Sequence, residues 1–265
     1  MLTNRFETVL ADTAESRDIH YGIRYQVFCE ETDFAESKRF PDLKERDDFD
    51  PYATHFIIWD RLERQWVGAM RLVGGAGLPM PCETIYEKPL EGLESLRERS
   101  RELSRLCVVA KYRQTPKSFR FGLATPDGDP GAPPTPVCFR QEDHEIMLRL
   151  LRASFSWGQA NSIDYCYASV NAAFASALRR FGIPLTVVGP AVEHHGPRIP
   201  HRYDVREAEA GMLSIQPSFP SLVRNAPAYV SYTDFVRGRT ATTKPATADI
   251  PGQPMPVLGD ATPHQ

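Results

Sequence analysis

The sequence predicts one α/β domain with a mixed central sheet and helices on both faces. Two observations support this fold class. In the first half of the chain, strand-like apolar segments follow one another closely enough to form a hairpin. In the second half, strands and helices alternate, an order that requires crossover connections. The chain has 265 residues, enough for one large domain or two small ones, and no internal repeat divides it.

The N-terminal region predicts helix from about residue 3 to residue 31, in one or two pieces. Within it, Tyr21, Arg24 and Phe28 recur at intervals of three and four, which places them on one helix face. A loop should follow over 34–51, because that segment is polar, charged and interrupted by two prolines.

The first half of the sheet is predicted from three apolar segments. Strands are expected at 55–59 and 67–73, and the linker between them is short enough for a hairpin. The charged residues 91–102 predict a short helix before the third strand. That strand, 102–109, is an apolar and β-branched run.

The segment 114–140 changes in character, being rich in proline and glycine with little that could build a core. We interpret it as a surface insertion. The domain is expected to span 1–238, while 239–265 is rich in Pro, Thr and Ala and predicts a disordered tail. Between insertion and tail, helices and strands should alternate at 142–160, 163–170, 172–181 and 185–188.

Composition excludes several classes of function. The net charge of −3 gives no electrostatic basis for binding nucleic acid or an anionic membrane. No apolar run approaches the roughly 20 residues that cross a bilayer, and the first residues lack the apolar core of a signal peptide. The five cysteines are widely spaced with no CxxC pair, so neither a zinc site nor a disulfide framework is expected. A reduced, cytoplasmic location is the simplest inference.

Glu102 and Arg105 stand three residues apart where the apolar strand begins. Burying either charge without a partner is costly, so their presence at this place needs a reason. A structural ion pair is one explanation, and a functional site is the other. The second is favoured by residues at the ends of the upstream apolar segments, namely Arg24, Phe28, Asp47, Asp50 and Arg71.

These residues form short motifs in a recognisable order. An Arg-to-Phe helix motif at 24–28 is followed by a D-x-x-D loop at 47–50, a strand ending in Arg-Leu at 71–72 and an E-x-S-R strand at 102–105. This order resembles the acyl-homoserine-lactone synthases, also called autoinducer synthases. The resemblance implies the mixed-sheet fold of GCN5-related N-acetyltransferases and an acyl-transfer reaction.

Two features resemble more closely the N-acyl amino acid synthases and the acyltransferases associated with exosortase (PEP-CTERM) systems. One is the insertion at 114–140, and the other is 195–200, whose His-Gly-Pro-Arg-Ile-Pro is similar to their H-G-x-R-x-P signature. Phe34 stands where autoinducer synthases carry a tryptophan that helps to hold S-adenosylmethionine, which argues against that acceptor. No glycine-rich loop follows the strand, as it would in coenzyme A-dependent relatives. The resemblance therefore implies an acyl-carrier-protein thioester as donor, with acyl-CoA as the alternative.

The chemistry of acyl transfer suggests a role for each candidate. Glu102 would take the proton of the attacking amine, since partial burial raises the pKa of a carboxyl group. Arg105 is the second catalytic candidate, and an arginine could also bind an acceptor's carboxylate. The predicted substrate-binding residues are Arg24, Phe28, Phe34, Asp47, Asp50, Arg71, Ser104 and Arg198. The expected partners are an acyl carrier protein and a small amine or amino acid, with no metal and no permanently bound cofactor.

Several alternatives stay open at this point. Arg24 with Asp47 or Asp50 could form a structural salt bridge between helix and loop, and Arg71 could be solvated at a strand end. Arg198 could belong to a partner surface or to the acceptor pocket. As functions, the alternatives are an acyl-homoserine-lactone synthase that uses S-adenosylmethionine and a catalytically silent module that binds acyl chains or their carrier. The acceptor, the acyl chain length and the oligomeric state are open.

Overall fold

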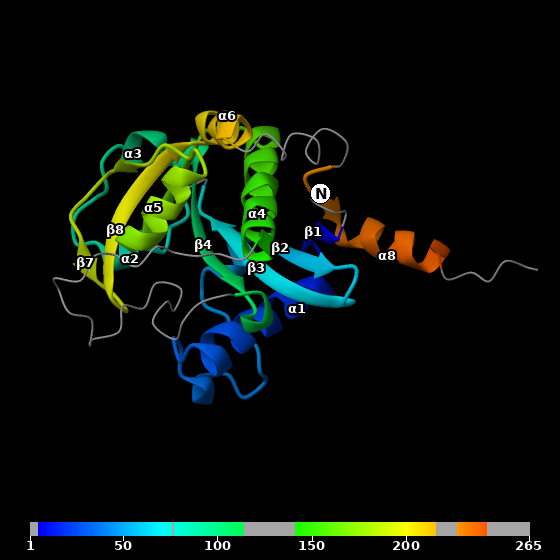
Figure 1. Cartoon of the computed structure of the whole chain (residues 1–265). Helices are drawn as coiled ribbons and strands as arrows, with labels where there is room; N and C mark the ends of the chain where they lie inside the picture. Colours follow the sequence, from blue (N-terminus) through cyan, green and yellow to red (C-terminus); the bar gives the residue numbers. More distant parts are fainter. Residues whose placement is uncertain (1–4, 76, 114–140, 216–226, 243–265) are drawn as a thin grey trace, which may run out of the picture.

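A computed structural model describes residues 5–75, 77–113, 141–215 and 227–242. The predicted insertion at 114–140 and the predicted tail from residue 243 onward lie outside these ranges. The described chain is built on one mixed β-sheet with helices packed against it (Figure 1). The predicted fold class is therefore confirmed.

Nine strands of the described chain form this sheet, in the order β6-β8-β5-β4-β3-β2-β1-β9, with β7 paired to β8 outside that path. From β1 to β4, each strand pairs antiparallel with the next one along the chain. Strand β5 pairs parallel with β4, and β8 pairs antiparallel with β5. The strands are β1 (Phe6–Leu10), β2 (Ala53–Asp60), β3 (Gln65–Val73), β4 (Ser100–Val108), β5 (Tyr165–Val170), β6 (Thr186–Val187), β7 (Val192–Glu193), β8 (Pro197–Asp204) and β9 (Val230–Ser231).

Helices cover the sheet on both sides. The long helix α4 packs across β1 to β4, and α1 packs against β2 and β3; Figure 1 shows these two helices on opposite sides of the sheet. The helices are α1 (Ala14–Tyr25), α2 (Cys82–Ile85), α3 (Leu93–Leu96), α4 (Gln141–Ala160), α5 (Ala172–Arg180), α6 (Val205–Ile215) and α8 (Tyr232–Thr242). None of them is long and apolar enough to cross a membrane.

The expectation of helix throughout 3–31 is wrong for residues 6–10, which form β1. Phe6 and Val9 are buried, and the segment pairs with β2 on one edge and β9 on the other. A short apolar run does not distinguish strand from helix by periodicity, and here the two neighbouring strands decide. Helix begins only after Thr13, whose hydroxyl accepts the Ser16 N–H at 3.1 Å.

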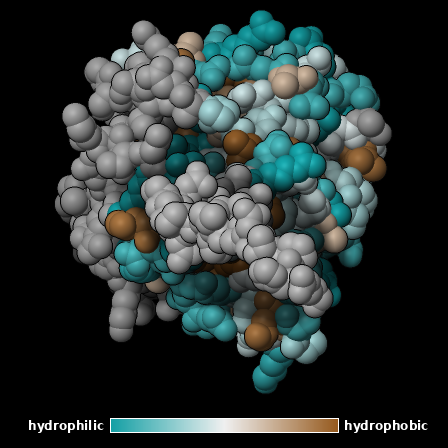
Figure 2. All heavy atoms as spheres, turned by 90° about the vertical axis from the view of Figure 1, so that its right-hand side faces the viewer, coloured by the Kyte–Doolittle hydropathy of each residue, from teal (hydrophilic) through white to brown (hydrophobic). Residues whose placement is uncertain are grey.

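The C-terminal elements β8, α6 and α8 were not predicted. Helix α8 continues to Thr242, so residues 239–242 are helical although the domain was expected to end near 238. It is anchored by aromatic contacts of Phe235 with Trp59 and Trp66 of the first hairpin. Figure 2 views this side of the molecule, where the described hydrophobic side chains lie at the surface as small separate areas among hydrophilic ones.

Two irregularities of β4 position the functional site. First, β4 pairs with β5 only from Ser100 to Glu102, after which no further pairing joins the two strands. Second, the pairing of β3 with β4 slips between Ala69 and Arg71, so that Arg105 and Leu106 of β4 stand opposite Met70 alone. This is a β-bulge, and Arg105 adopts a left-handed backbone there with φ 52°.

Candidate active site

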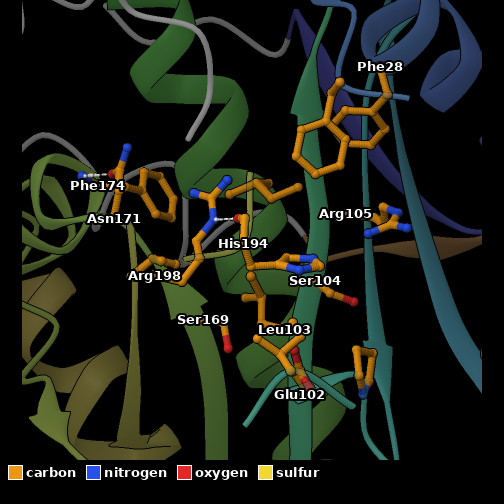
Figure 3. A pocket seen from close by; sticks show the side chains of 15 residues that line it. Phe28, Glu102, Leu103, Ser104, Arg105, Ser169, Asn171, Phe174, His194 and Arg198 are labelled. Carbon is orange, nitrogen blue, oxygen red and sulfur yellow. Dashed lines mark hydrogen bonds between the residues drawn. The ribbon is translucent and has the colours of Figure 1, made fainter. Parts of the chain in front are cut away.

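A pocket of about 160 Å³ opens between β4 and β5, beyond the point where their pairing stops (Figure 3). The parallel strands β4 and β5 diverge toward their carboxyl ends. Side chains from the ends of both strands therefore meet at one edge of the sheet. The lining residues are Phe28, Phe34, Pro81, Ile85, Glu102, Leu103, Ser104, Arg105, Leu106, Ser169, Val170, Asn171, Phe174, His194 and Arg198. The wall is mainly apolar, with a small number of polar groups, as ligand sites usually are.

Glu102 is the acidic side chain of this lining. It is only 3% exposed, and its Oε2 accepts the backbone N–H of Cys82, the first residue of α2, at 2.6 Å. Burial raises the pKa of Glu102 to about 7, although the Cys82 hydrogen bonds and the charges of Arg71 and Arg105 oppose the rise. Near neutral pH the carboxylate can therefore gain or lose a proton with little cost, which is the property of a general base.

The bulge brings the backbone of Arg105 and Leu106 to the pocket wall. In a bulge, two residues oppose one, so one of them leaves the regular ladder of hydrogen bonds. Backbone N–H groups in this situation can donate to an oxygen that gains negative charge during a reaction. Glu102 and the bulge lie three residues apart on one strand, so both belong to the same small site.

Behind β4 lies a closed network of three arginines and three carboxylates. Arg71 is fully buried; its Nη1 donates to Asp47 and Asp50, both at 2.6 Å, and its Nε donates to the Ser104 hydroxyl at 3.0 Å. A second guanidinium, that of Arg24, donates to the same Asp50 oxygen at 2.6 Å. The loop after α1 is thereby fastened to β3.

The remaining members extend the network to the bulge. Glu45 accepts hydrogen bonds from Arg24 and, at 3.2 Å, from Arg105, whose Nη2 also donates to Asp47 at 3.0 Å. Burial disfavours the charge on Asp47, yet the hydrogen bonds and charge of Arg71 hold its pKa to about 2. The lowered pKa values of Asp47 and Asp50 keep these two carboxylates ionised, so that they neutralise the arginines they contact.

The structure divides the predicted site residues into two groups. Those that line the pocket are Phe28, Phe34, Glu102, Ser104, Arg105 and Arg198. The others, Arg24, Asp47, Asp50 and Arg71, lie behind the wall in the ion-pair network. The substrate-binding role of this second group stays a prediction. For Arg24 and Asp50 the geometry favours the helix-to-loop salt bridge that was the structural alternative. The alternative for Arg71, solvation at a strand end, is wrong because its side chain is fully buried.

Sequence reasoning predicted Arg198 but missed the other polar residues of the opposite wall. Ser169 lies near the end of β5, and Asn171 follows that strand and caps α5 by accepting the Phe174 N–H at 2.8 Å. His194 comes from the turn before β8. Asn171 lies between a predicted strand and a predicted alanine-rich helix, and this position was a usable signal for a site residue. Ligand sites in such sheets form at the carboxyl ends of parallel strands, where this asparagine lies. Glu45 carried no signal of its own.

The two sides of the pocket meet at its mouth. Phe34, in the loop after α1, lies against the ring of His195 with centroids 4.5 Å apart, and against Phe28 at 5.3 Å. Arg198 fixes the turn that carries His195, donating to the carbonyls of His194 at 3.1 Å and of His195 at 3.0 Å. The H-G-x-R-x-P segment is thus part of the pocket. Across the described residues, no group of three His, Cys, Asp or Glu is arranged to hold a metal ion.

The family comparison agrees with this geometry. Residues 23–119 match the family described as acetyltransferase (GNAT) domain. This region of the chain is therefore similar to a GNAT acetyltransferase domain. The match includes the last turn of α1, the ion-pair network, the hairpin and β4 with its bulge, and the predicted acyltransferase activity is confirmed at this level. No curated protein sequence matches the chain.

Several solved structures are similar to this chain. One is the acyl-homoserine-lactone synthase LasI, with 16% identity and a TM-score of 0.53 over 79% of this chain and 95% of LasI. Another is BjaI, a CoA-dependent acyl-homoserine lactone synthase in complex with SAM and isopentyl-CoA, with 17% identity and a TM-score of 0.56 over 85% of this chain and 92% of BjaI. A third is FeeM, an N-acyl amino acid synthase from uncultured soil microbes, with 14% identity and a TM-score of 0.49 over 81% of this chain and 98% of FeeM.

Proposed function

We propose that this GNAT acyltransferase transfers a fatty acyl group from a thioester to the amino group of an amino acid or related small amine. The thioester donor is a substrate, carried by an acyl carrier protein or by coenzyme A. The observation that carries the proposal is Glu102, a buried carboxylate with a pKa raised to about 7 in a mainly apolar pocket.

The reaction needs a base because an amine is mostly protonated at neutral pH, and only its neutral form attacks a carbonyl. A carboxylate with an ordinary pKa is too weak a base to remove the ammonium proton efficiently. The burial of Glu102 raises its basicity toward the working pH, and the pocket keeps it within reach of a bound amine or of one intervening water.

The attack converts the thioester carbonyl into a tetrahedral oxyanion, from which the thiolate then leaves as the amide forms. The backbone N–H groups at the Arg105–Leu106 bulge are the proposed donors to that oxyanion. The apolar lining from Phe28, Leu103 and Phe174 suits an acyl chain, because it removes apolar surface from water. The acyl-carrier-protein donor and a role beside an exosortase system stay predictions from the sequence resemblance.

The deciding experiment is mass spectrometry of small molecules from cells that produce the wild-type protein, the Glu102→Gln variant or the Glu98→Gln variant. Glu98 is an exposed glutamate just before β4, so its variant controls for loss of a charge in this region. New N-acyl amino acids or amines should appear with wild type and Glu98→Gln. With Glu102→Gln they should fall by roughly 10²–10⁴-fold, the usual contribution of a general base.

Three results would contradict the proposal. Unchanged product with Glu102→Gln would remove the base assignment. Acyl-homoserine lactones in place of acyl amides would instead identify S-adenosylmethionine as the acceptor, despite Phe34. The absence of any acylated product, with purified thioester donors and amines also unreactive in vitro, would favour a silent binding module.

A further inference from the structure

Arg198 differs from the other arginines around the pocket. It is 8% exposed and lines the pocket wall, yet its hydrogen bonds within the described chain go to two backbone carbonyls, those of His194 and His195. No carboxylate of the described residues forms an ion pair with it. Arg24, Arg71 and Arg105, by contrast, each contact two carboxylates.

A buried guanidinium without a neutralising partner costs free energy. Its burial lowers the pKa of Arg198, which means that the surroundings disfavour the charge. Proteins keep such a group where a ligand supplies the opposite charge. The two carbonyl contacts leave Nη1 of Arg198 without a hydrogen-bond acceptor in the described chain.

A second observation concerns hydroxyl groups beside Arg198. The hydroxyl of Ser169 lines the same pocket, and that of Tyr86 lies near it. Both are buried, and apart from their interaction with each other neither has a hydrogen-bond partner among the described residues. In Figure 3, Glu102, Ser169 and Arg198 follow one another across the pocket from β4 to β8. The wall opposite Glu102 therefore offers a cation and hydroxyl donors, a combination complementary to an anionic oxygen group.

The anion could come from either substrate, as a carboxylate on the acceptor or a phosphate on the thioester donor. The phosphates of an acyl-CoA or an acyl carrier protein are separated from the reacting carbonyl by the whole pantetheine arm. The carboxylate of an α-amino acid lies only two bonds from its nitrogen. Because Arg198 and Glu102 line one pocket of about 160 Å³, the acceptor is the nearer source.

We propose that Arg198, with Ser169, binds the carboxylate of the acceptor, so that the acylated amine is one that carries an acidic group. This inference rests on the proposed function and deepens it, since it assigns the acceptor to the amino acids rather than to simple amines. The amino group would then face Glu102 while the carboxylate is held on the opposite wall.

The first test compares matched acceptors with the full-length wild-type protein. Lauroyl-CoA and a lauroyl acyl carrier protein serve as donors, and each amino acid is paired with the amine that lacks its carboxyl group, such as phenylalanine with phenethylamine. We expect kcat/KM to be higher for the amino acid of the best pair by roughly 10²–10⁴-fold, since a site built for a polar group rejects an analogue without it. Equal use of the two acceptors would overturn the inference.

The second test uses variants of the arginine. Arg198→Met should lower kcat/KM for the amino acid by roughly 100-fold or more, and by much more than it lowers kcat/KM for the simple amine. Arg198→Lys, which keeps the charge but loses the planar fork, should fall between. Arg206→Met removes an exposed arginine of α6 and is the control for charge loss. Circular dichroism and thermal melting show whether each variant folds. If Arg198→Met does not fold, the comparison of matched acceptors with the wild-type protein still tests the inference.

The outcomes separate this inference from the function on which it rests. If Arg198→Met raises KM for the thioester equally with both acceptors, Arg198 binds the donor's phosphate and the inference is overturned while the function stands. If wild type acylates no amine with either donor, the proposed function fails and this inference fails with it. A loss that is much larger with the carboxylated acceptors supports both.

Discussion

The pocket and the ion-pair network behind β4 treat buried charge in opposite ways. On the side of α1 and β3, three arginines and three carboxylates neutralise one another within 4 Å. Inside the pocket, Glu102 on β4 and Arg198 on the opposite wall are also buried, yet neither forms an ion pair in the described chain. Charges that the protein pairs internally hold its structure together, whereas charges that it leaves unpaired are available to a substrate.

The largest effect should come from breaking the paired side. Asp50 accepts hydrogen bonds from Arg24 and Arg71 on one oxygen and from the Asp47 N–H on the other. Asp50→Asn removes the charge that two buried guanidinium groups share, and should lower the free energy of unfolding by about 3–5 kcal/mol. Asp48→Asn, at an exposed neighbour, should change it by less than about 0.5 kcal/mol. Urea unfolding measures both, and equal stability of the two variants would show that the network is not structural.

The unpaired side makes the opposite prediction for stability. The pKa of Glu102 is about 7 in the folded protein and near 4.3 in an unfolded chain, so the folded state binds the extra proton between these values. Ionisation of Glu102 should therefore destabilise the fold by about 3 kcal/mol as the pH rises from 4 to 8. Glu102→Gln removes this loss, and should be more stable than wild type at pH 8 while having lost activity. A variant that loses stability at pH 8 would contradict the raised pKa.

Asp47 supplies the contrasting half of this pH dependence. Its pKa is lowered to about 2, so its contribution is present above the unfolded value near 3.9 and is lost as the pH falls toward 2. The stabilisation by the ion-pair network is thus lost in acid, whereas ionisation of Glu102 destabilises the fold in mild base. Melting temperatures of wild type and Glu102→Gln across pH 3 to 9 should converge at low pH and separate above about 5.

Catalysis should report the same unpaired carboxylate. If Glu102 must be ionised to accept the proton, kcat/KM of wild type should rise about tenfold per pH unit below 7 and level off above it. The measurement is the initial rate with a saturating thioester donor across pH 5 to 9, and Glu98→Gln should follow the same profile. A rate without an inflection near pH 7 would mean that another group removes the proton.

The ion-pair network was only partly predictable from sequence. The residues Arg24, Asp47, Asp50 and Arg71 could be recognised because they occur in motifs of known order. Their mutual pairing depends on the loop after α1 folding back onto β3, and on Glu45, which has no local pattern. Sequence spacing records which residues are present, while a three-dimensional contact between residues far apart in the chain decides which charges cancel.

The pocket residues were even less predictable from sequence. Glu102 was predicted from its place at the start of an apolar strand, and burial is the cause of its shifted pKa. The bulge at Arg105 was not visible, because two residues facing one is a property of the strand pair. Ser169 and Asn171 were missed since the meeting of β4 and β5 follows from a crossover that passes through α4. Likewise, β1 was predicted as helix because its neighbouring strands lie far along the chain.

The smallest effect should decide to which side Ser104 belongs. Ser104 lines the pocket and was predicted to bind substrate, but its hydroxyl accepts the Nε–H of Arg71 at 3.0 Å. If it serves the ion-pair network, Ser104→Ala leaves one donor of a buried arginine unsatisfied and should lower the free energy of unfolding by about 1–2 kcal/mol, with KM for the acceptor unchanged. If it binds substrate, KM should rise several-fold with little change in stability. Ser104 lies on β4 between the ion-pair network and the pocket. Comparing the unfolding midpoint of Ser104→Ala with its KM for the acceptor therefore shows where the internally paired charges end and the substrate site begins.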